Sequence, residues 1–257
     1  MLGTTPQPWT DDVFLGDRLK IRQPVRGYRA GADAVLLAAT VIAAEGAPLE
    51  VLDVGSGAGV IGLCVAARLP GARVALLERE AELAELAHFN TAANAFQDRV
   101  RPVRASITEP LSGDARAALP ADSFTHVLAN PPFHDEHRGT PASSALKAAS
   151  HAMAEGDLDA WVKFMARMTA PHGTATLIHK AEALPAVLET FGARFGGMIV
   201  KPIQARRDGP AIRIIVCGRK GSRAPLVLQR PFILHDEGNS FTREANAILR
   251  HGASLEL

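Results

Sequence analysis

The chain has 257 residues, of which 47% are hydrophobic, and its formal net charge is +1 at pH 7. This length suits one large α/β domain or one domain with an appendage, and the near-neutral total does not mark the whole molecule as a polyanion binder. No apolar run approaches the about 18 residues that a membrane helix needs, so we do not expect a membrane protein.

The N-terminus and the cysteine content indicate a compartment. Residues 1–17 lack the basic-then-apolar order of a signal peptide. The two cysteines, Cys64 and Cys217, do not make a disulfide framework. We therefore expect a reduced, cytoplasmic protein.

The first predicted element is a helix over residues 31–44, in which Asp33 is placed to cap the helix or to act at its N-terminus. After it, strands and helices alternate. The predicted strands are LEVLDV, ARVALLE, VRPVRA, FTHVLA, GTATLIH, GGMIVKPI and AIRIIVCGR, and the predicted helices cover 60–68, 81–94, 158–168 and 184–191. This alternation predicts an α/β fold, doubly wound and Rossmann-like, with a mainly parallel seven-stranded sheet and an antiparallel edge hairpin.

Basic residues gather near both ends of the chain. Residues 194–230 hold nine Lys or Arg against one acid, and residues 18–29 are also basic. Such local charge can steer a nucleic acid, although solvated strand and hairpin surfaces would look the same. We expect residues 1–45 to pack as a basic segment and helix on a core of 46–257, as one structural domain overall. The candidate phosphate contacts are Arg22, Arg26, Arg29, Arg206, Arg207 and Arg213.

The stretch VLDVGSGAGVIGL (51–63) joins a strand, a glycine turn and a helix without a gap, which lets the backbone pass close to a nucleotide. Its glycines fit a dinucleotide pattern from Gly57 and a methyltransferase pattern from Gly55, and the spacing from the strand favours the second. Glu78 ends the next strand, where a carboxylate could accept both ribose hydroxyls of either cofactor. The candidate cofactor residues of this region are Asp53, Gly55, Ser56, Gly57, Gly59 and Glu78.

The stretch VLANPPFH (127–134) identifies the chemistry more closely. Pro131 and Pro132 end the strand and stiffen its exit. Asn130 then offers a side-chain carbonyl and Pro131 a backbone carbonyl, and together they could hold both N–H groups of an exocyclic or amide nitrogen. Held in this way, the nitrogen lone pair would face a methyl donor, while Phe133 would stack on the base. A stiff turn with a buried Phe is the structural alternative.

Residues 130–133 resemble the N-P-P-[FY] motif of class I S-adenosylmethionine-dependent methyltransferases, of the small-domain family. Within that family, segments 27–38, 201–213 and 234–250 are most similar to the tRNA adenine-N6 methyltransferases that modify valine tRNA beside its anticodon. The resemblance implies S-adenosylmethionine as cofactor and RNA, first of all tRNA, as partner. It implies a catalytic role for Asn130, Pro131, Pro132 and Phe133, and cofactor contacts for Asp33, Asn130 and Ser106, the last replacing the family's acidic residue after the third strand.

Several alternatives stay open. The same motif resembles guanine-N2 methyltransferases of ribosomal RNA, and a protein glutamine amide or a nucleotide-binding module without catalysis would also fit. The row of potential ligands at 134–137 lacks the separated segments of a tetrahedral site, so we expect no structural metal. The sequence leaves the RNA, the nucleotide position and the oligomeric state open.

Overall fold

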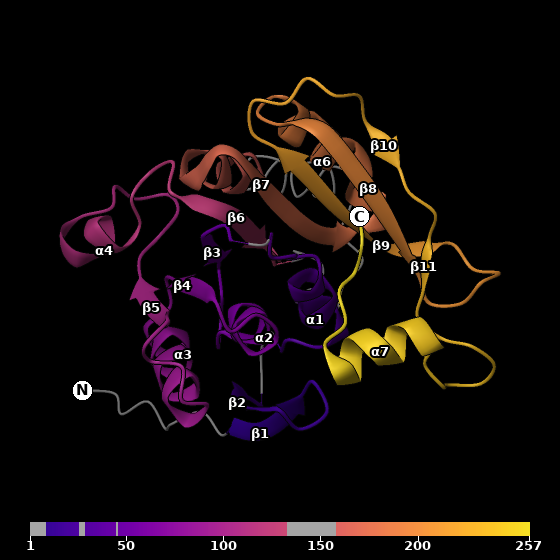
Figure 1. Ribbon diagram of the computed structural model, residues 1–257, viewed down its shortest axis with the longest axis horizontal. Helices are drawn as coiled ribbons and strands as arrows, with labels where there is room; N and C mark the ends of the chain where they lie inside the picture. The colour runs from indigo at the N-terminus through magenta and orange to yellow at the C-terminus, as the bar shows by residue number, and fades with distance from the viewer. Residues whose placement is uncertain (1–8, 26–28, 45, 133–157) are drawn as a thin grey trace, which may run out of the picture.

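The computed structural model describes residues 9–25, 29–44, 46–132 and 158–257. A central sheet lies between two layers of helices, and a separate hairpin of β1 (Trp9–Phe14) and β2 (Leu19–Pro24) lies beside one layer (Figure 1). In this part of the chain, no helix combines the length and the apolar character needed to cross a membrane.

The central sheet has nine strands in the order β10-β8-β9-β7-β6-β3-β4-β5, with β11 also paired to β8. The strands are β3 (Leu49–Val54), β4 (Ala72–Glu78), β5 (Val100–Arg104), β6 (Phe124–Ala129), β7 (Thr169–Lys180), β8 (Gly196–Gln204), β9 (Ala211–Arg219), β10 (Val227–Leu228) and β11 (Phe232–Ile233). Strands β3 to β7 pair in parallel, whereas β9 is antiparallel to both of its neighbours, β7 and β8. This topology confirms the predicted doubly wound, mainly parallel α/β fold with its antiparallel hairpin.

The strand count is larger than the predicted seven. All seven predicted strands are present, and the two additional ones, β10 and β11, pair with β8. Each has only two residues. Because an alternation of buried and exposed residues cannot show in two positions, the sequence pattern did not reveal them.

Helices cover both faces of the sheet, as Figure 1 shows. The helices are α1 (Ala32–Ala39), α2 (Val60–Arg68), α3 (Ala81–Ala93), α4 (Gly113–Ala118), α6 (Leu184–Gly192) and α7 (Arg243–His251), with residues 158–168 also helical. One buried cluster joins α1, α2 and α7 to the sheet, and a second cluster joins α6 and the 158–168 helix to the other face. Since both faces are covered, the central strands are almost continuously buried, as in β3.

The helix predicted over 31–44 is shorter in the structure and ends at Ala39. Thr40 follows it, with its Oγ1 donating to the Leu37 carbonyl at 2.7 Å, and the Ala39 carbonyl accepts the N–H of Leu255 at 2.9 Å. The apolar pattern continues past the helix because Val41 is still buried. The apolar sequence pattern alone therefore overestimated the length of the helix.

The β1–β2 hairpin was not predicted. The inward-facing residues of β2 are Leu19, Ile21 and Gln23, and all three are buried. Because Gln23 is polar, the sequence does not show the alternation of apolar and polar residues that predicts a strand. Leu19 and Ile21 belong to the same buried cluster as α1, α2 and α7. The hairpin therefore packs on the same buried cluster as these helices, and the division of the chain into domains stays a prediction.

Candidate active site

Three of the predicted site segments meet at the carboxyl edge of the sheet. Val54, the last residue of β3, lies opposite Leu77 of β4 and opposite Ala129 of β6. The next residue on each strand is therefore Gly55, Glu78 or Asn130, side by side at one edge. Ligands of open α/β sheets bind at this edge, where the strands end.

Two glycines of the turn after β3 serve different purposes. Gly55 and Gly57 both have left-handed backbone, with φ values of +66° and +55°. A Cβ at Gly55 would collide with the ring of Trp161, whereas a Cβ at Gly57 would meet nothing within 4 Å. Gly55 thus allows close packing, and Gly57 leaves an open approach for a ligand.

The remaining glycines of the motif shape helix α2. Gly59 is the N-cap residue of α2, and a Cβ at Gly62 would collide with Leu76 of β4. Gly62 is therefore required for packing between the helix and the sheet. Its match to the dinucleotide pattern gives no information about the cofactor.

Asp53 is fully buried at the base of the turn. Its Oδ2 accepts the N–H of Gly62 at 3.0 Å, while its Oδ1 is buried and has no hydrogen-bond partner among the described residues. The pKa of Asp53 is raised to about 7, mainly by burial. The hydrogen bond from Gly62 opposes this rise, and the nearby charge of Glu78 adds to it. One oxygen therefore holds the first turn of α2, and the other is a buried polar atom whose hydrogen bond a ligand could supply.

Glu78 is held against the glycine turn. Its Oε2 accepts the N–H of Gly57 at 2.8 Å, and its Oε1 accepts the N–H groups of Arg79 and Glu80 at 2.8 and 2.9 Å. Only 7% of Glu78 is exposed. These backbone donors fix the carboxylate at the mouth of the turn, in the position where sequence reasoning expected a ribose ligand.

Two serines lie near this carboxylate. Ser56 is buried in the turn, and its Oγ has no hydrogen-bond partner within the described residues. Ser106 follows β5, next to Glu78 of β4 because Glu78 pairs with Arg104, and its Oγ bonds with Thr108 Oγ1 at 2.9 Å. A buried hydroxyl without a partner and a glycine with an open side both fit a bound polar ligand.

The start of the proline stretch is described as far as residue 132. Asn130 is 6% exposed, Pro131 is buried and Pro132 is exposed. Phe133 lies outside the described residues, as do Arg26 and the row of potential metal ligands at 134–137. Within the described ranges, no group of three or more His, Cys, Asp or Glu side chains could hold a metal ion.

Asp33 does not cap helix α1. The N-cap is Gly31, without a side-chain hydrogen bond, and Asp33 instead forms an ion pair with Arg213 of β9 at 2.8 Å. Since β9 begins opposite the end of β7, where Arg213 pairs with Lys180, this ion pair lies at the carboxyl edge. Asp33 therefore joins the start of α1 to the β8–β9 hairpin at the same edge as Asn130.

The other predicted phosphate contacts fall into two groups. Arg22 forms an ion pair with Asp11 at 2.9 Å, with its guanidinium over the rings of Trp9 and Phe89, and Arg29 pairs with Asp12 at 2.6 Å. In the turn between β8 and β9 (residues 205–210), Arg206 donates to the Asp236 carbonyl at 3.1 Å and Arg207 is exposed. Arg22 and Arg29 are thus each paired with a carboxylate of β1, whereas Arg206 donates to a backbone carbonyl.

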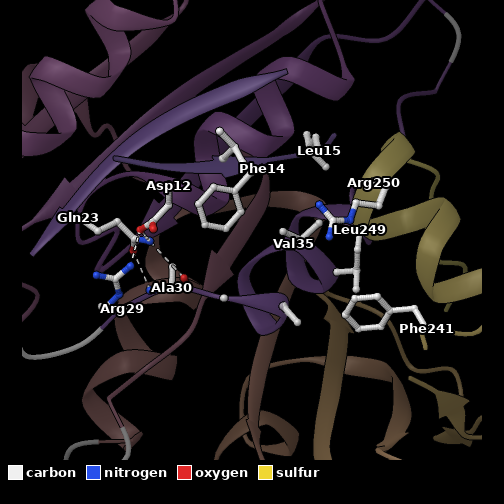
Figure 2. A pocket seen from close by; sticks show the side chains of 13 residues that line it. Asp12, Phe14, Leu15, Gln23, Arg29, Ala30, Val35, Phe241, Leu249 and Arg250 are labelled. Atoms are coloured by element: carbon white, nitrogen blue, oxygen red, sulfur yellow. Dashed lines mark hydrogen bonds and ion pairs between the residues drawn. The ribbon is translucent and has the colours of Figure 1, made fainter. Parts of the chain in front are cut away.

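Sequence reasoning missed how the hairpin contributes to this region. Figure 2 shows Gln23, Asp12, Arg29 and Ala30 joined by hydrogen bonds and ion pairs on the inner face of the hairpin. They line a cavity of about 310 Å³ between the hairpin, α1 and α7, and Gln23 and Ala30 also face a small pocket lined by Ser56 and Gly57. No motif marks Gln23 or Trp161, because their roles depend on segments that are distant in the sequence.

Comparison with known proteins gives the family. The model of the methyltransferase small domain matches residues 32–162, half of the chain. A tRNA1(Val) (adenine(37)-N6)-methyltransferase of Porphyromonas gingivalis is 34% identical over 132 residues, 51% of this chain and 51% of that protein. A ribosomal RNA small subunit methyltransferase C of Pseudomonas fluorescens is 37% identical over 112 residues, 42% of this chain and 30% of that protein.

A solved structure extends the likeness over most of the chain. It is described as a predicted O-methyltransferase, protein Atu636, of Agrobacterium tumefaciens, and it is 31% identical with a TM-score of 0.71, covering 88% of this chain and 99% of that one. By contrast, the match spans about half the length of the curated tRNA relative. The glycine turn, the neighbouring Glu78 and Asn130, and these matches together show that the chain belongs to the methyltransferase small domain family and uses S-adenosylmethionine as its cofactor.

Proposed function

We propose that this protein transfers a methyl group from S-adenosylmethionine to an exocyclic amine of a base in RNA, first of all to adenine N6 in tRNA. The observation that carries the proposal is the register of the sheet, because Asn130 follows β6 directly beside the glycine turn after β3. A carboxamide that borders the cofactor turn can hold an amine next to a methyl donor.

The cofactor side of the site is assigned to the turn and its neighbours. Glu78 would accept the ribose hydroxyls, and Ser56 and Asp53 each offer a buried oxygen without a partner among the described residues. Asp33 and Ser106 stand at the same edge as further candidates. When bound, the cofactor supplies an electrophilic methyl group on a sulfonium.

The substrate side is assigned to Asn130, Pro131, Pro132 and Phe133. The Oδ1 of Asn130 and the carbonyl of Pro131 would accept the two N–H groups of the amine, which turns the nitrogen lone pair outward. Positioning of this kind lowers the barrier without a strong base, because the amine is held in line with the methyl group. Phe133 would stack on the base that carries the amine.

The relatives name more than one substrate. Ribosomal RNA appears in the name of the Pseudomonas fluorescens relative, and the Agrobacterium tumefaciens structure is described as a predicted O-methyltransferase. We favour a nitrogen acceptor because a carboxamide and a carbonyl are two hydrogen-bond acceptors, which match the two hydrogens of an amine better than the single hydrogen of a hydroxyl.

The decisive experiment identifies the methylated nucleoside. The purified protein is incubated with labelled S-adenosylmethionine and with unmodified tRNA, unmodified ribosomal RNA or an added protein extract, and the RNA is digested to nucleosides. Label in N6-methyladenosine from tRNA is the expected result. Label in N2-methylguanosine would show that the substrate base is guanine. Label on a ribose oxygen would contradict the assignment of an amine acceptor. Label only in the added protein would indicate a glutamine amide as substrate.

A further inference from the structure

Asn90 of helix α3 connects three parts of the molecule that are distant in the sequence. It is fully buried. Its Oδ1 accepts the N–H of Arg22 at 2.8 Å, and its Nδ2 donates to the carbonyls of Arg22 and Ala58, both at 2.9 Å. One amide therefore joins α3, strand β2 and the glycine turn.

Asn94, the C-cap residue of α3 and four positions after Asn90, makes the same kind of contact with β2. Its Oδ1 accepts the N–H of Lys20 at 3.1 Å, and its Nδ2 donates to the Lys20 carbonyl at 2.8 Å. The third bond differs, because Asn94 donates to the carbonyl of Asn90 at 2.8 Å and not to the glycine turn. The two amides thus replace a neighbouring strand at the open edge of β2, and only Asn90 also reaches the turn.

The hairpin that these amides hold forms a wall opposite the glycine turn. Gln23, Pro24 and Ala30 line a small pocket together with Ser56 and Gly57 of the turn. Gln23 accepts the N–H of Ala30 at 2.9 Å and donates to the Ala30 carbonyl at 3.3 Å, which fixes the chain that leads to α1. Asn90 bonds both to β2 of this hairpin, at Arg22, and to the turn, at Ala58, so its bonds bear on the separation between the wall and the turn.

We infer that Asn90 is a positioning residue for the cofactor, because it sets the separation between the glycine turn and the hairpin wall. The inference rests on the proposed assignment of the turn to S-adenosylmethionine. Asn90 itself lies behind the turn, bonded to the Ala58 carbonyl, so it acts through the backbone. A turn held by fewer bonds would have to be ordered by the ligand, which reduces affinity.

The matched pair Asn90→Ala and Asn94→Ala tests this inference. Each variant removes the amide that pairs with the backbone of β2, but only Asn90→Ala frees the Ala58 carbonyl. Calorimetry with S-adenosylhomocysteine is expected to show at least about 10-fold weaker binding for Asn90→Ala and a change within about 2-fold for Asn94→Ala. Thermal unfolding of both variants controls for a general loss of stability.

Equal losses of affinity in the two variants, or unchanged affinity in Asn90→Ala, would overturn the inference. If Asn90→Ala does not fold, hydrogen exchange of the wild-type protein decides instead. S-adenosylhomocysteine should slow exchange of the Arg22 N–H, which bonds to Asn90, more than that of the Lys20 N–H, which bonds to Asn94. Equal slowing would contradict the inference, whereas a wild-type protein that binds no S-adenosylhomocysteine would remove the cofactor assignment of the turn itself.

Discussion

The turns after β3 and β6 lie side by side at one edge of the sheet, yet they are fixed by different means. The turn after β3 is made of flexible residues and is held from outside, by Glu78 on Gly57 and by Asn90 on Ala58. The turn after β6 begins with Asn130 and continues with two prolines, whose rings restrict the backbone directly. The shape of the first turn therefore depends on groups from other segments, whereas the prolines restrict the second turn from within.

The largest effect is expected from the first glycine of the β3 turn, compared with the second. Gly55→Ala combines left-handed backbone with a collision against Trp161, and should lower the free energy of unfolding by about 2 to 5 kcal/mol. Gly57→Ala meets no neighbour and should cost only about 1 to 2 kcal/mol, while it obstructs the open approach.

Urea unfolding and calorimetry with S-adenosylhomocysteine measure the two properties separately. Gly57→Ala should lose affinity out of proportion to its loss of stability. Similar stability losses in the two variants would contradict the assignment of Gly55 to packing and of Gly57 to ligand approach.

Asn130→Ala tests the substrate side of the comparison. Removal of one preorganised hydrogen-bond partner should slow methyl transfer about 100-fold, or by about 3 kcal/mol, with cofactor affinity nearly unchanged. Asn130→Asp keeps an acceptor and should retain more activity than the alanine variant. Single-turnover methylation of an unmodified transcript by the three proteins gives the rates. A wild-type rate in Asn130→Ala would show that the motif has only a structural role, as a stiff turn.

Asp53 makes the stability of the β3 turn depend on pH. Because burial raises its pKa to about 7, from an ordinary value of 3.8, the folded protein holds a proton that the unfolded chain has released. The stabilisation from this proton is complete below pH 3.8 and is lost as pH rises toward 7. Between about pH 5 and 8 the loss should amount to about 2 to 3 kcal/mol.

Asp53→Asn removes this titration and retains an acceptor for the N–H of Gly62. Urea unfolding of both proteins at several pH values should show the wild type losing stability, relative to Asp53→Asn, as pH rises. Parallel pH curves would mean that the carboxyl group is not protonated in the folded protein.

The smallest effect is expected at the 205–210 turn, and it tests whether the substrate side extends beyond Asn130. Reversal of charge at Arg206 and Arg207 should weaken RNA binding without a change in cofactor affinity. The slope of the logarithm of RNA affinity against the logarithm of salt concentration should fall in magnitude by about one to two, because fewer counterions are released. Arg73→Glu is the control, because Arg73 lies at the opposite end of the sheet, near the start of β4. Titrations at several salt concentrations that give equal slopes for all variants would assign these arginines to ordinary solvated surface.

The sequence was informative where one segment carries a complete signal. The apolar strands, the glycine turn and the two prolines each predicted their local structure, and parallel pairing then brought Gly55, Glu78 and Asn130 together. The β1–β2 hairpin and the contacts of Asn90 could not be predicted in the same way. A side-chain amide that replaces a neighbouring strand leaves no periodic pattern, and it is recognisable only when its partner, here Arg22, is already in position.

The count of charges along the chain missed these ion pairs for a related reason. Residues 18–29 read as basic, but the register of the hairpin places Asp11 opposite Arg22, and Arg29 reaches Asp12. A count of charges along the chain cannot include partners that only a turn brings into contact. Arg213 is likewise paired, with Asp33, although the two residues are 180 positions apart.

The position of β9 has a consequence for how the protein is made. β9 follows β8 in the chain but lies between β7 and β8 in the sheet. While the ribosome has synthesised the chain only as far as β8, the edge of β7 that β9 will cover is exposed, and an exposed edge invites pairing with other chains. The β8–β9 hairpin then has to join β7 as a unit, so a nascent chain stalled before residue 211 should be especially prone to aggregation and dependent on chaperones.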